Sequence, residues 1–217
     1  MKYNLAGRLI AVIALVATLP LLVACVVAIY LEDRGAILFR QVRVGIGGKP
    51  FCLLKLRSMR TSRAGQKITA GGDARITAVG RWLRDFKLDE LPQLWNVVRG
   101  DMNLIGPRPE VPEYVDLSDS RWAAVLAFRP GITDLSSLVF RNEERMLAGQ
   151  EDVETFYREW LLPRKLEMST HYAQNRSLLT DARLISLTLR HVITRREMNR
   201  DEIRRQFSYG GTLTWTR

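Results

Sequence analysis

The chain contains almost no cysteine and almost no histidine. Only two of its 217 residues are cysteines and two are histidines. A disulfide framework, a zinc site built from cysteine and histidine, and a Ser-His-Asp triad are therefore not indicated, and a reducing compartment is the simpler interpretation. Internal repeats and low-complexity segments are also lacking, which excludes a repeat array. The length suits one domain with a short appendage.

Acidic residues are in deficit. The chain carries 33 basic and 23 acidic residues, for a formal net charge of +10. Such an excess suits nucleic acid, an anionic lipid surface or a phosphorylated substrate. The basic residues are scattered, and neither aromatic-basic interleaving nor helix-turn-helix spacing occurs, so we expect no nucleic-acid partner.

One long stretch has no charge at all. Leu9 to Leu31 spans 23 residues, and about 20 helical residues cross a bilayer core. A cleaved signal peptide normally has an apolar region of about 7–15 residues, so this run is too long for one. Leu22-Val-Ala-Cys25 resembles a lipoprotein processing box, but the apolar run continues beyond it. We predict a membrane anchor over residues 1–34.

A proline divides this anchor. Pro20 removes a backbone donor and favours a kink or a break, and the Thr18 hydroxyl is close enough in sequence to bond a freed backbone group. Lys2 and Arg8 flank one end, while the other end opens into a basic domain. Positive charge at both ends fits two cytoplasmic ends. From the residues alone, a single-pass helix and a re-entrant (broken) helix both remain open.

The rest of the chain predicts an α+β fold that is dominated by helices. Two short apolar runs, Ala36–Phe39 and Phe51–Leu54, flank the glycine-rich residues 45–48 and predict a short β-hairpin. A polar loop is expected over 62–73. Apolar spacing predicts further helices, at Thr77–Phe86, Leu91–Val98, Arg121–Phe128, Glu151–Thr170 with an interruption at Pro163, and Ser177–Ile193.

The predicted domain covers residues 35–200 and is followed by a C-terminal tail over 201–217. The last predicted helix carries an apolar stripe that includes Leu178, Ile185 and Leu189, with arginines nearby. A basic amphipathic helix of this kind lies either on a membrane surface or against the core, and the sequence favours neither.

The densest polar region lies between residues 88 and 109. Asp89 and Glu90 fall in or just before the first turn of a predicted helix, where the helix dipole favours a carboxylate. An Asp-Glu pair by itself is more often a cap than a catalytic dyad. Arg108 stands between two prolines, and its planar guanidinium suits phosphate oxygens, although an arginine–carboxylate pair in a turn is the alternative. Arg129 and Lys55 offer further cations.

Several motifs occur in a fixed order. They are Phe39–Gly45, Lys55–Met59, Asp73–Arg84, Leu88-Asp-Glu-Leu-Pro-Gln-Leu-Trp-Asn96 continuing to Met102, Gly106-Pro-Arg-Pro109 and Arg129-Pro-Gly-Ile-Thr133. The ordered set resembles the monotopic phosphoglycosyl transferases, also called bacterial sugar transferases, in their small catalytic-core form. The resemblance covers nearly the whole chain.

The resemblance implies a fold and a location. It implies a re-entrant helix broken near Pro20 and interfacial amphipathic helices. It also implies a catalytic domain on the cytoplasmic face of the bacterial inner membrane. The implied substrates are a UDP-sugar and polyprenyl (undecaprenyl) phosphate, with Mg²⁺ as cofactor. The implied products are polyprenyl diphosphate-sugar and UMP, in the first membrane step of a surface glycan or glycoconjugate pathway.

The resemblance also assigns roles to residues. Asp89 would be the nucleophile that holds a covalent phosphosugar, a logic that splits one transfer between two anions into two steps. Glu90 would bind magnesium together with Asp89 or orient the diphosphate. Arg108 would bind substrate phosphate. The remaining phosphate-binding candidates are Lys55, Arg84 and Arg129.

The chain departs from the family pattern at several positions. Ala11 stands where many members have an acid, and Leu19 precedes Pro20 where a serine is common. Residues 134–137 and 140–144 also differ, so the sugar stays open. A non-catalytic membrane adaptor that binds anionic phospholipid is the alternative function, motivated by the charge and the anchor. Whether the chain forms a homo-oligomer is left open.

Overall fold

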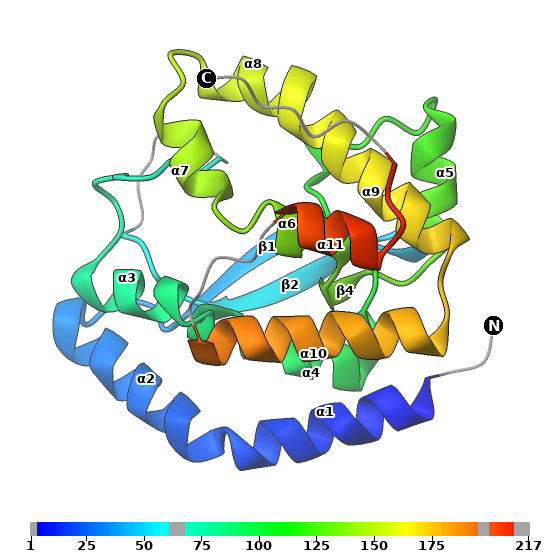
Figure 1. Cartoon of the computed structure of the whole chain (residues 1–217). Helices are drawn as coiled ribbons and strands as arrows, with labels where there is room; N and C mark the ends of the chain where they lie inside the picture. The colour runs from blue at the N-terminus through cyan, green and yellow to red at the C-terminus, as the bar shows by residue number, and fades with distance from the viewer. Residues whose placement is uncertain (1–3, 61–67, 195–199, 211–217) are drawn as a thin grey trace.

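Two small β-structures lie among many helices (Figure 1). The computed structural model describes residues 4–60, 68–194 and 200–210. One β-structure is an antiparallel hairpin and the other is a parallel pair. The predicted helix-dominated α+β class and its short hairpin are thus confirmed. Residues 62–67 of the polar loop predicted over 62–73 lie outside the described residues, and residues 68–73 contain no helix or strand.

The N-terminal segment is a bent pair of helices. Helix α1 (Leu5–Ala17) and helix α2 (Leu19–Asp33) meet at 59°, and only together do they have the length and apolar composition of a membrane span; no single described helix has both. The Thr18 hydroxyl donates to the Ala14 carbonyl at 2.7 Å, a carbonyl that also accepts from the Thr18 N–H, so this bond does not go to a group freed by Pro20. Pro20 lies in the first turn of α2, where its missing N–H is tolerated. The predicted break near Pro20 is therefore confirmed.

One face of the bent pair packs on the domain. Ala11 is fully buried in a cluster with Leu94 and Val97 of α4 (Gln93–Arg99). A methyl side chain lets the two helices approach closely, so Ala11 has a packing role here. Helices α1 and α2 run along the lower edge of Figure 1, and their other faces leave large apolar side chains exposed. Among them are Leu5, Leu9, Ile13, Val16, Leu19, Val23, Val27 and Leu31.

The hairpin pairs β1 (Leu38–Val44) with β2 (Pro50–Leu56), and Lys55 lies opposite Phe39. Gly47 and Gly48 have φ of 66° and 76° in the turn η1 (Ile46–Gly48), a region that L side chains rarely adopt. Helix α3 (Ala78–Asp85) follows, and the Thr77 hydroxyl caps it by accepting from Gly80 N–H at 2.9 Å.

The parallel pair joins β3 (Asn103–Ile105) to β4 (Gly131–Thr133) and was not predicted. Strands of three residues are too short to show an alternating pattern. Helix α5 (Ser120–Leu126) and the short turn η3 (Pro112–Tyr114) lie between them in the chain. The largest core cluster lies between this pair and the C-terminal half. The helices of that half are α6 (Leu135–Val139), α7 (Glu143–Ala148), α8 (Val153–Phe156), α9 (Leu162–Gln174), α10 (Leu178–Thr194) and α11 (Arg200–Gln206).

The predicted helix over 151–170 continues past its proline. Helix α8 runs through a π-helical turn, η4 (Tyr157–Leu161), directly into α9. Pro163 lies in the first turn of α9, and the wider π turn before it accommodates the residue without a break. The interruption is therefore a change of helical pitch.

Helix α10 has a buried face and an exposed apolar face. Leu184 and Leu187 are buried, whereas Leu178 and Leu189 are 89% and 56% exposed. The stripe noted in the sequence thus faces outward, and the core alternative is wrong for these two residues. At the C-terminal end, the two aromatic residues that follow α11, Phe207 and Tyr209, belong to the largest core cluster. Residues 201–210 of the predicted tail are therefore folded against the domain.

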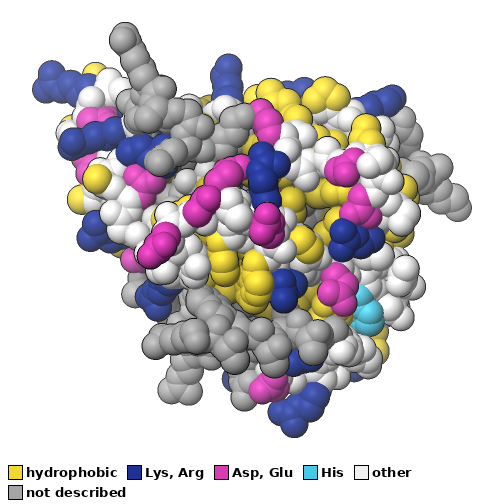
Figure 2. All heavy atoms as spheres, turned by 90° about the horizontal axis from the view of Figure 1, so that it is seen from above, with side chains coloured by type: hydrophobic (Ala, Val, Ile, Leu, Met, Phe, Trp, Pro, Cys, Tyr) yellow, Lys and Arg dark blue, Asp and Glu magenta, His cyan; other side chains and the backbone are white. Residues whose placement is uncertain are grey.

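The face opposite α1 and α2 has a different character. Figure 2 shows it from above, with Lys and Arg side chains interspersed among Asp and Glu and only small apolar areas between them. The molecule thus has exposed apolar side chains on α1 and α2 and a charged surface on the far side.

Candidate active site

Asp89 and Glu90 lie in a short helical turn, η2 (Leu88–Glu90), that leads through Pro92 into α4. Lys87, just before the turn, has φ of 57°. A non-glycine residue in this left-handed region is strained, and such strain concentrates at functional sites. The sharp turn places Asp89 inside the domain, where only 5% of its surface is exposed.

Glu90 is held by two cations. Lys55 Nζ and an Arg108 guanidinium nitrogen lie 3.0 Å and 2.7 Å from the same oxygen, Oε1 of Glu90. Burial alone raises the pKa of the Glu90 carboxyl, but Arg108 and then Lys55 outweigh burial and hold it well below its usual range. Glu90 is therefore a fixed anion, and it brings Lys55 and Arg108 together.

Asp89 has the opposite environment. Burial, and next the negative charge of Glu90, raise the pKa of Asp89 above its usual value, while Lys55 opposes them. Its Oδ1 atom is buried and has no hydrogen-bond partner within the described chain. Buried acceptors without a partner are rare in folded proteins. This oxygen therefore has an unused hydrogen-bonding capacity inside the domain.

The backbone places two arginine motifs side by side. Gly106 N–H donates to the Thr133 carbonyl at 3.1 Å, and Gly131 N–H donates to the Pro107 carbonyl at 3.0 Å. A Cβ atom on Gly131 would lie 2.1 Å from the Gly106 nitrogen, so the strands touch where only glycine fits. The segment that carries Arg108 is thereby fixed against the segment after Arg129.

The structure joins Lys55, Asp89, Glu90 and Arg108 into one cluster, with Arg84 nearby. The Arg84 charge lowers the pKa of Asp89, but its guanidinium is paired with Glu144 of α7 and donates to Ser58 Oγ.

Arg129 stands apart from that cluster. No hydrogen bond or ion pair links it to the dyad in the part of the chain that the structure describes, and its Nε is buried without a partner there. Its connection to the site is through the backbone beside Arg108.

Two residues of α4 were not singled out from the sequence. The fully buried Asn96 accepts from Leu54 N–H at 3.0 Å and donates to the Cys52 carbonyl at 2.8 Å, which fixes α4 to the edge of β2. Gln93 is 1% exposed, and its Nε2 has no partner among the described residues. A spacing of three places Glu90, Gln93 and Asn96 on one side of the helical segment. The sequence signal that could have identified Gln93 and Asn96 is that both are polar residues within an otherwise apolar helical segment.

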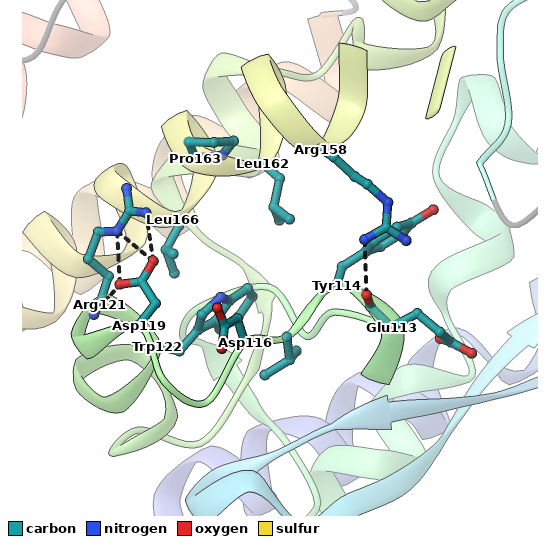
Figure 3. A pocket seen from close by; sticks show the side chains of 11 residues that line it. Glu113, Tyr114, Asp116, Asp119, Arg121, Trp122, Arg158, Leu162, Pro163 and Leu166 are labelled. Carbon is teal, nitrogen blue, oxygen red and sulfur yellow. Dashed lines mark hydrogen bonds and ion pairs between the residues drawn. The ribbon is translucent and has the colours of Figure 1, made fainter. Parts of the chain in front are cut away.

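A separate cavity of about 250 Å³ lies between α5 and α9. Figure 3 shows Arg158 pointing to the Glu113 carbonyl, and Asp119 paired with Arg121, at its wall. None of the predicted site residues lines this cavity. The described residues also contain no group of three or more His, Cys, Asp or Glu side chains that could hold a metal ion. The dyad therefore offers two carboxylates and no closed metal cage.

The sequence signature of the family described as bacterial sugar transferase matches residues 3–195. The chain belongs to this family. The resemblance noted in its ordered motifs is thus confirmed, and the dyad, the Arg108 segment and the bent anchor all lie within the matched region.

Proteins of three bacteria are similar in sequence to this chain. The chain is 39% identical over 180 residues to a UDP-glucose:undecaprenyl-phosphate glucose-1-phosphate transferase of Caulobacter vibrioides, covering 81% of this chain and 63% of that protein. It is 36% identical over 191 residues to a UDP-N-acetylgalactosamine-undecaprenyl-phosphate N-acetylgalactosaminephosphotransferase of Aeromonas hydrophila, covering 86% and 42%. It is 32% identical over 183 residues to the uncharacterized sugar transferase EpsL of Bacillus subtilis, covering 84% and 83%. The chain thus spans less than two thirds of the first two relatives.

Proposed function

We propose that this protein is an enzyme that transfers a sugar-1-phosphate from a UDP-sugar to undecaprenyl phosphate. The observation that carries the proposal is the buried Asp89 carboxylate, whose Oδ1 has no hydrogen-bond partner among the described residues, beside a Glu90 that is neutralised by Lys55 and Arg108. The names of the relatives support the substrate class. A membrane adaptor has no use for such a site.

The reaction takes two steps at one phosphorus atom. An Asp89 oxygen attacks the sugar-bearing phosphate, the phosphorus–oxygen bond to the nucleotide breaks, and UMP leaves. An oxygen of the lipid phosphate then attacks the same phosphorus, and the bond to Asp89 breaks. The products are undecaprenyl diphosphate-sugar and a free carboxylate. Because the transfer is divided into two steps, the buried Asp89 carboxylate reacts with one charged substrate at a time.

The surrounding cations make this approach of anions feasible. Among the described residues, the Arg108 guanidinium donates a hydrogen bond to Glu90 alone, so its other donors remain for phosphate oxygens. Lys55 contacts the same Glu90 oxygen as Arg108 does, and Arg84 and Arg129 are the outer phosphate-binding candidates. Charge neutralisation of this kind accounts for most catalysis of phosphoryl transfer.

Magnesium fits the dyad. Mg²⁺ prefers oxygen ligands and is commonly held by one or two carboxylates together with substrate phosphates. Asp89 supplies an open oxygen, and Glu90 supplies a second carboxylate beside it. When bound, the ion neutralises charge on the donor diphosphate.

The anchor is proposed to be re-entrant, with both ends on the cytoplasmic side of the inner membrane. The 59° bend, the packing of α1 on α4 and the exposed apolar faces of α1 and α2 support this topology. The outward stripe of α10 supports interfacial contact with phospholipid.

Cysteine labelling tests the topology. In a variant whose native cysteines are replaced, a cysteine at Asn4 is expected to react from the same side of sealed vesicles as a cysteine at Asp201 of the domain. A single-pass anchor would place Asn4 on the other side, so labelling of the two positions from opposite sides would refute the re-entrant topology.

The reaction is tested by UMP release. Purified protein in lipid nanodiscs is incubated with undecaprenyl phosphate, Mg²⁺ and each of a panel of UDP-sugars. We expect release with one or a few donors, its loss on adding EDTA, and its recovery on adding excess Mg²⁺. Anionic-liposome binding without release from any donor would instead favour the adaptor.

A further inference from the structure

Asn96 joins the strand of Lys55 to the helix that follows the dyad. It is fully buried on α4, its Oδ1 accepts from Leu54 N–H at 3.0 Å, and its Nδ2 donates to the Cys52 carbonyl at 2.8 Å. These two backbone groups flank Leu53 at the edge of β2. A residue of a neighbouring parallel strand bonds the same pair of groups, so the Asn96 amide takes the place of a strand there.

The orientation of this amide is fixed by its other contacts. Its Nδ2 also donates to a carboxylate oxygen of Asp101 at 3.2 Å, so a turned amide would bring Oδ1 against two acceptors. The Asn96 backbone carbonyl accepts from Gly100, Asp101 and Met102 N–H at 2.9–3.2 Å. Since a buried polar group is costly to leave unpaired, β2 cannot slide along α4 without breaking bonds that water does not replace.

The same edge of β2 determines where Lys55 stands. Lys55 follows Leu54 directly, and its Nζ lies 3.0 Å from Glu90 Oε1. Glu90 belongs to the helical segment that continues through Pro92 into α4 and carries Asn96. Successive side chains of a strand point to opposite faces, so a slip of β2 by one residue would turn Lys55 away from Glu90. The Asn96 bonds therefore set the register in which these two charges meet.

The hairpin depends on such outside contacts. In the part of the chain that the structure describes, it is a sheet of two strands, and a two-stranded hairpin alone is only marginally stable. Val44 N–H donates to the Glu110 carbonyl at 2.9 Å, which holds the end near the turn. Nearer to Lys55, the buried Leu53 packs in one cluster with Leu94 of α4, and the Asn96 amide adds direction to that apolar contact.

We propose that Asn96 is a positioning residue for the transfer reaction: its bonds to β2 set the place of the Lys55 ammonium against the Asp89–Glu90 dyad. The proposal rests on the roles of the dyad and Lys55 in the proposed function. Asn96 acts on the dyad through Lys55. Charges interact strongly in a poorly solvated site, so a small displacement of Lys55 changes how readily the two carboxyl groups ionise.

The pH dependence of kcat/KM for UMP release tests the proposal. Burial raises the pKa of Asp89 and of Glu90, and Lys55 is among the cations that lower both. If Asn96→Ala displaces Lys55, both pKa values rise, and the carboxylates become protonated at a higher pH. We expect the acidic limb of the profile to move up by about one pH unit.

The other cations that act on the dyad stay in place in this variant. They are Arg84, Lys87 and Arg108, and among the described residues none of them is hydrogen-bonded to the Asn96 side chain. A moved limb therefore reports on Lys55.

Val125→Ala is the matched control. Val125 is 5% exposed on α5, in an apolar cluster that contains no residue of β2 or α4. Its truncation destabilises the domain as Asn96→Ala does, so both variants should lower the midpoint of thermal unfolding. Only Asn96→Ala should move the acidic limb, because a merely structural loss leaves the limb where it is in the native protein.

A double-mutant cycle shows whether the effect passes through Lys55. The ratio kcat/KM is measured on the acidic limb for the native protein, Asn96→Ala, Lys55→Met and the double variant. A shift of one pH unit is about a tenfold loss there. If Asn96 acts through Lys55, the double variant should match Lys55→Met within about twofold. Losses that multiply would overturn the inference, because they would show that the two residues act independently.

An acidic limb that Asn96→Ala leaves in place would also overturn it. If that variant fails to fold, Asn96→Ser replaces it, because the serine hydroxyl can still bond one of the two backbone groups; a limb moved to higher pH supports the inference and an unmoved one overturns it. The proposed function is judged separately. Native UMP release that Asp89→Asn abolishes supports the reaction whatever Asn96 does, and a failure there is seen without any Asn96 variant.

Discussion

Asp89→Asn is expected to abolish UMP release, by about 10⁴-fold or more, while the protein keeps its fold. The amide has the size of the carboxyl group but cannot attack phosphorus. Because burial raises the pKa of Asp89, the ionised side chain is disfavoured in the folded state. A neutral amide relieves that cost, so we expect an unchanged or higher midpoint of thermal unfolding.

The matched control is Asp85→Asn, which removes the same charge from an exposed position at the end of α3. Native release is expected there. Trapping a covalent phosphosugar by mass spectrometry should succeed with the native protein and fail with Asp89→Asn. Retained turnover in Asp89→Asn would remove Asp89 from the nucleophile role without affecting the family assignment.

Gly131→Ala is expected to destabilise the protein by about 3 kcal/mol. The new Cβ atom would lie 2.1 Å from the backbone nitrogen of Gly106 and 2.5 Å from its oxygen. Backbone atoms in a strand pair cannot rotate away as a side chain does, so β3 and β4 must separate. Because the Arg108 segment depends on this contact, activity should fall together with stability, as thermal unfolding and UMP release will show.

Gly149→Ala provides the control for that prediction. Apart from the glycine and its chain neighbours, no atom of the described residues lies within 4 Å of a Cβ placed there, and the φ of −90° suits any residue. Its stability should stay within about 0.5 kcal/mol of the native value. Equal effects at both glycines would contradict the close strand contact.

The sequence predicted the parts of the fold that depend on near neighbours. The hairpin and α3 followed from local spacing and from turn residues, and the break at Pro20 followed from the chemistry of proline. The parallel pair of β3 and β4 did not, because its partners are separated by more than twenty residues and each has only three. Pairing between such short distant strands leaves no pattern in either segment.

For the candidate site as well, the sequence predicted the residues that lie in local motifs but not the contacts between distant elements. Asp89, Glu90 and Arg108 stood out through their motifs, and the structure brings Glu90 and Arg108 into contact. The contacts of Asn96 with β2 and of Lys165, on α9, with Glu110 could not be predicted, because each depends on what a distant element places beside it. A lysine on an amphipathic helix is normally solvated, and only the fold shows that Lys165 is buried among carboxylates.

Helix α4 also connects the anchor to the Asp89–Glu90 dyad. Arg8 of the anchor donates to the Arg99 carbonyl at one end of α4, and the dyad lies just before the other end. Seven helical residues span about 10 Å, and Ala11 closes the contact between the two helices. The carboxylate that we propose to react is therefore held at a fixed position relative to the exposed apolar faces of α1 and α2. With those faces in a bilayer, as proposed, a lipid phosphate that moves only within the membrane plane would meet Asp89 at one depth, so the search for the acceptor becomes a two-dimensional one.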